Sequence, residues 1–101
     1  MKIGVIKETQ KGEKRVAISP NISKLLIEKG FELLVEEDAG LASSYKNSDY
    51  ESAGAKIVSR ETLFNESTVL IKINPFDEDD LKLVNNTQIL MSQLYYKSNA
   101  E

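Results

Sequence analysis

Histidine and cysteine are both absent from this sequence of 101 residues. Without cysteine, the chain can form neither a disulfide nor a thiolate metal site. Without histidine, it lacks the side chain best suited to proton transfer near neutral pH, so such transfer would depend on carboxylates, lysine or tyrosine. From its residue types we therefore expect no catalytic residue and no metal site in this chain.

The sequence also lacks the marks of nucleic-acid binding, secretion and membrane insertion. The net charge is −3, and lysine and glutamate are mixed along the whole length, so there is no basic stripe for a phosphate backbone. Residues 1–6 are too short and too quickly charged for a signal peptide. No apolar run approaches the roughly 20 residues of a membrane helix. We expect a soluble, cytoplasmic chain that binds no nucleic acid.

Short apolar runs instead alternate with helical segments, over a length that suits one domain. The runs at 2–7, 31–36, 56–58, 68–73 and 88–94 predict strands. The segments at 20–29, 48–54, 59–64 and 77–84 predict helices, the second of them capped by Ser48. This alternation predicts one α/β domain, doubly wound, with a mostly parallel five-stranded sheet of flavodoxin or Rossmann type.

The glycines do not form a dinucleotide-binding loop. A Rossmann site needs a G-x-G-x-x-G turn between the first strand and helix, so that the backbone can approach the pyrophosphate. The five glycines, at 4, 12, 30, 40 and 54, never approach that spacing. We expect no cofactor-binding residue within this chain and no measurable binding of NADH by the chain alone.

Residues 1–20, MKIGVIKETQKGEKRVAISP, contain a strand, Lys-Glu, a polar loop, Arg-Val-Ala and Ser-Pro. Further matching pieces lie at 30–32, 35–40, 50–55 and 70–75. In this order they resemble the N-terminal region shared by alanine dehydrogenase and the alpha subunit of NAD(P) transhydrogenase. The resemblance covers essentially the whole chain. It implies that residues 1–101 are a single α/β lobe, the N-terminal part of a larger two-domain enzyme subunit.

Two positions distinguish the branches of this family. Alanine dehydrogenases have a substrate-holding lysine where this sequence has Asn74, and a catalytic histidine where it has Tyr95. Residues 92–101 also resemble the transhydrogenase, apart from positions 96, 97 and 100. The resemblance favours proton-translocating NAD(P) transhydrogenase subunit alpha. The alternatives are the substrate lobe of an alanine dehydrogenase-like enzyme and a stand-alone flavodoxin-like binding module.

The favoured branch implies cofactors and partners for the complete enzyme. It would use NAD and NADP and couple hydride transfer to proton translocation. Its partners would be the NAD-binding domain of the same subunit and separate NADP-binding and membrane components. The complete enzyme would be a homodimer associated with the inner (cytoplasmic) membrane, and the lobe alone would be inactive. In isolation, we expect an exposed apolar patch or self-association.

Four residues could line an interdomain cleft: Arg15, Lys72, Asn74 and Tyr95. Arg15 matches the arginine that binds substrate carboxylate in alanine dehydrogenase, and its planar fork suits a carboxylate or phosphate. The alternative, which we favour, is a loop arginine that forms an ion pair with Glu8 or Glu13.

Lys72, Tyr95 and the acidic run at 77–80 also have two interpretations each. Lys72 could point into the cleft or extend to solvent at a strand end. Tyr95 could meet the nicotinamide or pack as an interface aromatic. The acidic run at 77–80 resembles a metal cluster, but we interpret it as a solvated helix start whose charge suits the helix dipole.

Overall fold

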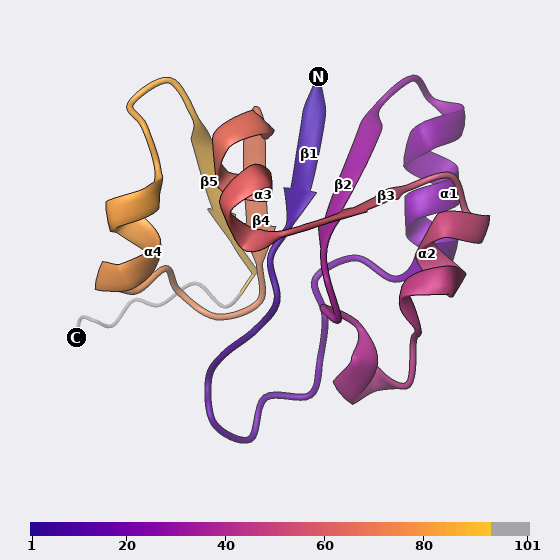
Figure 1. Ribbon diagram of the computed structural model, residues 1–101, viewed down its shortest axis with the longest axis horizontal. Coiled ribbons are helices and arrows are strands. Elements are labelled where there is room, and N and C mark those ends of the chain that lie inside the picture. Colours follow the sequence, from indigo (N-terminus) through magenta and orange to yellow (C-terminus); the bar gives the residue numbers. More distant parts are fainter. Residues whose placement is uncertain (94–101) are drawn as a thin grey trace.

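The computed structural model describes residues 1–93 and contains one five-stranded parallel sheet (Figure 1). The strand order is β3-β2-β1-β4-β5, and every neighbouring pair is parallel. The doubly wound α/β prediction is therefore confirmed. The strands are β1 (Lys2–Val5), β2 (Glu32–Glu36), β3 (Lys56–Val58), β4 (Val69–Lys72) and β5 (Ile89–Ser92).

All four expected helices connect these strands. They are α1 (Pro20–Glu28), α2 (Asn47–Ser52), α3 (Arg60–Glu66) and α4 (Glu78–Leu83), and a short 3-10 helix, η1 (Leu41–Ser43), was not predicted. Among residues 1–93, no helix combines the length and apolar character that crossing a membrane requires.

The start of α2 differs from the prediction. Lys46, not Ser48, is the residue before the helix, because the Asp49 carboxylate accepts a hydrogen bond from the Lys46 backbone N–H at 2.7 Å. The Asn47 side chain is meanwhile paired with Asp38, accepting from its backbone N–H at 2.8 Å. The helix therefore also includes Asn47 and Ser48, which a cap at Ser48 would have left outside it.

Helices cover the two faces of the sheet separately. α1 packs on β2 and α2 on β3, whereas α3 packs on β1 and β2 from the other side. Alternate residues of β2 accordingly enter different cores. One core holds Val5, Ile18, Leu33, Val35, Ala39, Tyr50 and Ala55, and the other holds Ile6, Leu34, Leu63, Phe64 and Leu70.

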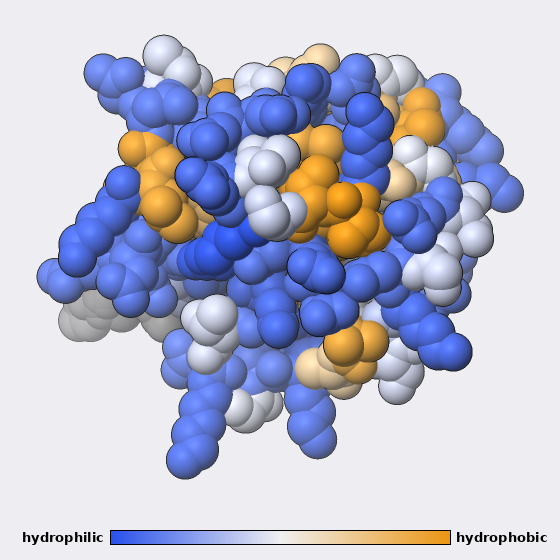
Figure 2. Space-filling model, in the orientation of Figure 1, coloured by the Kyte–Doolittle hydropathy of each residue, from blue (hydrophilic) through white to orange (hydrophobic). Residues whose placement is uncertain are grey.

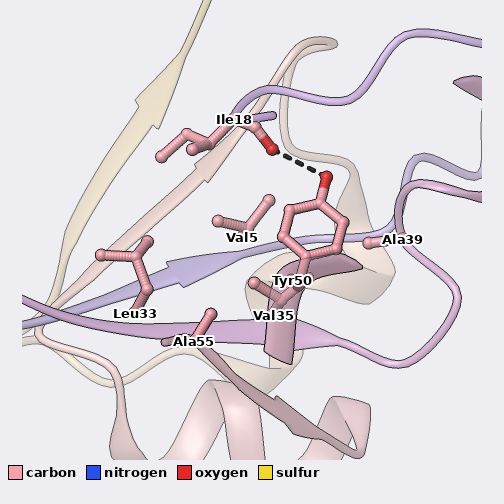
Figure 3. Packing of buried hydrophobic residues seen from close by; sticks show 7 residues of the cluster. All are labelled: Val5, Ile18, Leu33, Val35, Ala39, Tyr50 and Ala55. Carbon is pink, nitrogen blue, oxygen red and sulfur yellow. Dashed lines mark hydrogen bonds between the residues drawn. The ribbon is translucent and has the colours of Figure 1, made fainter. Parts of the chain in front are cut away.

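Tyr50 ties α2 to the connection between β1 and α1 (Figure 3). Its ring is fully buried, and its hydroxyl donates to the Ile18 carbonyl oxygen at 2.8 Å. Burial raises the pKa of Tyr50, with smaller contributions from Tyr45 and Asp49. The hydroxyl therefore stays a donor at neutral pH, which anchors the polar loop that follows β1.

Candidate functional site

Two polar networks lie at the carboxyl ends of the strands, where doubly wound sheets bind their ligands. The first, called the loop network below, consists of Glu8, Glu13, Arg15 and Asn74. The second, called the α3–α4 network, consists of Glu36, Arg60, Lys72 and Asp80.

Glu8 connects the loop after β1 to the end of β4. Its carboxylate accepts from the backbone N–H of Ile73 at 2.6 Å and of Asn74 at 3.2 Å. It also accepts from the Asn74 side-chain amide at 3.1 Å. Because these partners lie 65 and 66 residues away in sequence, one side chain sets the spacing between two strand ends.

Asn74 is buried between two carboxylates. Its Nδ2 atom donates to Glu8 Oε1 at 3.1 Å and to Glu13 Oε1 at 3.0 Å. An amide nitrogen carries two protons, so both are used. The end of β4 therefore presents a neutral side chain held in a fixed orientation.

Arg15 forms a two-pronged ion pair with Glu13. Its Nε and Nη2 atoms each donate to a Glu13 oxygen at 2.9 Å, and its backbone N–H donates to the same carboxylate at 2.8 Å. The Arg15 side-chain hydrogen bond is the main cause that lowers the pKa of Glu13 to about 2. The ion-pair interpretation of Arg15 is thus confirmed with Glu13, while 60% of the Arg15 side chain stays exposed.

The α3–α4 network is more deeply buried. Lys72 Nζ lies 2.9 Å from Asp80 Oδ2, and the two side chains are 3% and 0% exposed. Arg60 pairs with both carboxylates: its Nη2 atom donates to Asp80 Oδ1, and its Nη1 atom lies 3.1 Å from Glu36 Oε1. Glu36 also accepts from the backbone N–H of Lys7 at 2.9 Å, so this network holds the start of the same loop.

Lys72 does not extend to solvent, so that interpretation is wrong. Its ammonium group is paired with Asp80 and lies 5.7 Å from the centre of the Phe76 ring. Lys72 therefore belongs to the α3–α4 network, whereas Arg15 and Asn74 share the loop network. Tyr95 lies outside the described residues.

The acidic run at 77–80 starts α4, as expected. Asp77 accepts a hydrogen bond from the backbone N–H of Asp80 at 2.8 Å, and Asp80 accepts one from the backbone N–H of Asp77 at 3.0 Å. Asp80 is buried, however, so the solvated interpretation is wrong for this residue. Burial raises its pKa, but hydrogen bonds from the Asp77 backbone and from Lys72 outweigh burial and lower it overall. Within residues 1–93, no cluster of potential metal ligands is found.

The residues after β1 do not fit a dinucleotide pyrophosphate. The first position of α1 is Pro20, which has no N–H, and the Ser19 hydroxyl already accepts from the Ile22 N–H at 3.3 Å. Gly12 has φ +84°, but a Cβ there would meet no atom within 4 Å, so no close backbone approach requires this glycine. The connection between β1 and α1 therefore lacks the glycine-rich pyrophosphate turn of a Rossmann site.

Two hollows at the surface of residues 1–93 lie away from both networks. One of about 390 Å³ is bordered by Pro20, Asn21, Tyr45, Asp49 and Ser52, beside α1 and α2. None of these residues belongs to either network.

Five of the eight residues in these networks were not predicted as site residues. Glu8 and Glu13 were considered only as partners of Arg15, and Glu36, Arg60 and Asp80 were not identified as site residues. A charged residue ending a run that is otherwise apolar, such as Glu36 or Lys72, was the available signal, because such a residue must find a partner when the strand is buried.

The strand order and the polar carboxyl edge define a doubly wound α/β lobe without a dinucleotide loop of its own. The chain belongs to the family described as the alanine dehydrogenase/PNT N-terminal domain. The sequence model of this family matches residues 4–101.

Similar proteins include both branches of this family. The chain is 39% identical to an alanine dehydrogenase of Staphylococcus haemolyticus, over 94% of this chain and 26% of the relative. It is 35% identical to alanine dehydrogenase 1 of Staphylococcus aureus, over all of this chain and 27% of that protein. The chain thus spans about a quarter of the length of these relatives.

Two solved structures share the fold equally well. A transhydrogenase from Sinorhizobium meliloti matches with a TM-score of 0.86 and 26% identity, over 91% of this chain and 27% of that chain. An L-alanine dehydrogenase matches with a TM-score of 0.86 and 30% identity, over 91% and 26% respectively. The lobe is therefore part of an oxidoreductase family of dehydrogenases and transhydrogenases.

Proposed function

We propose that this chain is the N-terminal part of an NAD(P) transhydrogenase alpha subunit, which supports hydride transfer between NAD(H) and NADP(H). The observation that carries the proposal is the chemistry of Asn74. At the end of β4, this neutral amide donates to Glu8 and Glu13 and acts as neither an acid nor a base near neutral pH. Hydride transfer between two nicotinamides needs positioning and control of charge, not a base at the reacting carbons.

The remaining side chains of the loop network support the same reaction. With a pKa of about 2, Glu13 is ionised at neutral pH and is a weak base. The 101 residues contain no histidine that could take its place. The likeness to the Sinorhizobium meliloti transhydrogenase is compatible with this proposal.

A second candidate is the substrate lobe of an alanine dehydrogenase. Two observations favour it. The chain is up to 39% identical to alanine dehydrogenases of staphylococci. In addition, the exposed Arg15 guanidinium has further donors beyond the two that Glu13 uses, which would suit a carboxylate.

Assays of the complete protein distinguish the two candidates. We expect NADPH to reduce an NAD analogue, and we expect no NADH to form from NAD and alanine. Alanine-dependent formation of NADH would contradict the proposal and favour the second candidate.

A variant tests the part played by Asn74. N74A removes the amide that Glu8 and Glu13 hold, so the end of β4 loses its fixed position and hydride transfer should slow by up to about 100-fold. D79N, at an exposed residue of α4, is the matched control and should keep the wild-type rate. Equal rates for the two variants would remove the support that Asn74 gives.

The cofactors, partners and location of the complete protein follow from the same proposal. Its NAD and NADP would be bound outside this lobe, by the second domain of the subunit and by a separate component. The complete protein would be a homodimer at the cytoplasmic membrane. Calorimetric titration of the 101-residue chain with NADH should show no binding, and tight binding would contradict this division of roles.

A further inference from the structure

The two polar networks meet at the ends of β1 and β4. At each of these strand ends, one residue is bonded within the α3–α4 network and a close neighbour in sequence belongs to the loop network. At the end of β1 these residues are Lys7 and Glu8, and at the end of β4 they are Lys72 and Asn74. Consecutive Cα atoms are only 3.8 Å apart across a trans peptide, so a shift in one network must be felt in the other.

The first connection between the networks runs through the end of β2. The Oε1 atom of the buried Glu36 accepts from the Lys7 N–H at 2.9 Å and from Arg60 Nη1 at 3.1 Å. Because one oxygen accepts both bonds, the position at which Lys7 is held depends on how Arg60 orients this carboxylate. The next residue, Glu8, accepts from the Ile73 N–H at 2.6 Å and so carries that position across to β4.

The second connection runs through the start of α4. Arg60 Nη2 donates to Asp80 Oδ1, while Lys72 Nζ lies 2.9 Å from the other oxygen of the same carboxylate. The Asp80 side chain is fully buried, so a water molecule cannot readily replace either cation as its partner. Lys72 is the last residue of β4 and lies two positions before Asn74. The orientation of Asp80 therefore bears on the place of the Asn74 amide.

Arg60 is the side chain that joins these two connections. In the part of the chain that the structure describes, it pairs with both Glu36 and Asp80, whereas Lys72 pairs with Asp80 alone. A guanidinium presents its donors in a rigid planar fork, so it fixes the separation of two carboxylates in a way that an ammonium group cannot. The Arg60 guanidinium carbon also lies 4.9 Å from the centre of the buried Phe64 ring, which restricts its movement.

We propose that Arg60 is a positioning residue for the loop network: through Glu36 and Asp80, it sets the separation of the ends of β1 and β4 on which the Glu8–Asn74 contacts depend. Within residues 1–93, no hydrogen bond or ion pair joins Arg60 to the loop network directly, so its effect is carried by the two carboxylates. The effect of Arg60 on hydride transfer rests on the proposed function. Its effect on the geometry of the loop network does not.

Side-chain NMR of the 101-residue chain tests the geometric part of the proposal. The two Asn74 amide protons donate to Glu8 and Glu13, so their chemical shifts report the state of the loop network. R60Q cannot hold both carboxylates of the α3–α4 network. It should shift the Asn74 amide signals and speed hydrogen exchange at the Ile73 N–H by about 10-fold, because local opening exposes this group.

Two further variants make the NMR comparison decisive. Figure 2 shows the face of the molecule on which α3 lies, where hydrophilic residues dominate and apolar ones form small, separate areas. E61Q changes an exposed residue of α3 next to Arg60, so it is the matched control and should leave the Asn74 signals unchanged. R60K keeps the positive charge without the planar fork and should give intermediate shifts. Circular dichroism checks folding, and R60K decides if R60Q does not fold. Wild-type signals in a folded R60Q or R60K would overturn the proposal.

A double-mutant cycle in the complete protein tests the functional part. R60K should slow hydride transfer by roughly 3- to 10-fold in the wild type but cause no further loss in N74A, because both variants disturb the same contacts. Fold-changes that simply multiply would show that Arg60 acts independently of Asn74 and would overturn its positioning role. A complete protein without transhydrogenase activity would contradict the proposed function, whereas the NMR comparison would still decide the role of Arg60.

Discussion

The loop network and the α3–α4 network lie at the same edge of the sheet but differ in charge balance and burial. The α3–α4 network matches two carboxylates with two cations and buries Lys72 and Asp80 almost completely. The loop network matches two carboxylates with one guanidinium and one neutral amide, and most of Arg15 is exposed. The charges of the α3–α4 network are therefore paired away from water, whereas the loop network leaves the Arg15 guanidinium in contact with solvent.

The largest effect should come from breaking the buried network. D80A leaves the Lys72 ammonium without its partner and removes one half of the capping interaction of α4, so it should lower the free energy of unfolding by roughly 3–5 kcal/mol. Urea denaturation measures this loss. D79A, one residue away and exposed, is the control and should change stability by less than about 0.5 kcal/mol. Equal losses of unfolding free energy in D80A and D79A would mean that the buried Lys72–Asp80 pair does not stabilise the fold.

An intermediate effect should come from Glu8. E8A leaves the backbone N–H groups of Ile73 and Asn74 without their acceptor, at a cost of about 1–3 kcal/mol. E8Q keeps one acceptor oxygen and should recover part of this loss in the same denaturation experiment. A loss as large as that of D80A would show that the loop network is as important to the fold as the buried one.

The smallest effect should come from Glu13 and should depend on pH. Its folded-state pKa of about 2 lies below the ordinary value of 4.5, so its stabilisation is present above pH 4.5 and disappears as the pH falls toward 2. E13Q should therefore differ from the wild type at neutral pH and approach it near pH 2. Thermal melts across this range give the comparison. A difference that persists at pH 2 would contradict the assigned ionisation.

The sequence was sufficient to predict the architecture because the signals for it are local. Five apolar runs separated by capped helices require a parallel sheet with crossovers. The predicted ends of the strands were less accurate. Strand β1 was expected to reach Lys7 but ends at Val5, because the Lys7 N–H is taken by the Glu36 side chain. The η1 turn, closed by a bond from Ser43 to Gly40, had no distinct sequence signal.

The contacts of the candidate site could be predicted only where the two contacting residues are close together in the sequence. Glu13 and Arg15 are two residues apart, and their pairing was one of two options considered. Glu8 and Asn74 are 66 residues apart, and the strand order that brings them together does not follow from alternation alone. The Lys72–Asp80 pair was missed because four acidic residues at a helix start suggested exposure to solvent.

The central position of β1 also determines how the polypeptide can fold. The partners Lys2 and Glu32 of the β1–β2 pair are about 30 residues apart in sequence, whereas the partners Ile3 and Val69 of the β1–β4 pair are about 66 residues apart. Loop-closure entropy grows with the length of chain enclosed, so the first pairing is favoured over the second. Docking of β4 against β1 should accordingly limit the folding rate, as long-range contacts do in general.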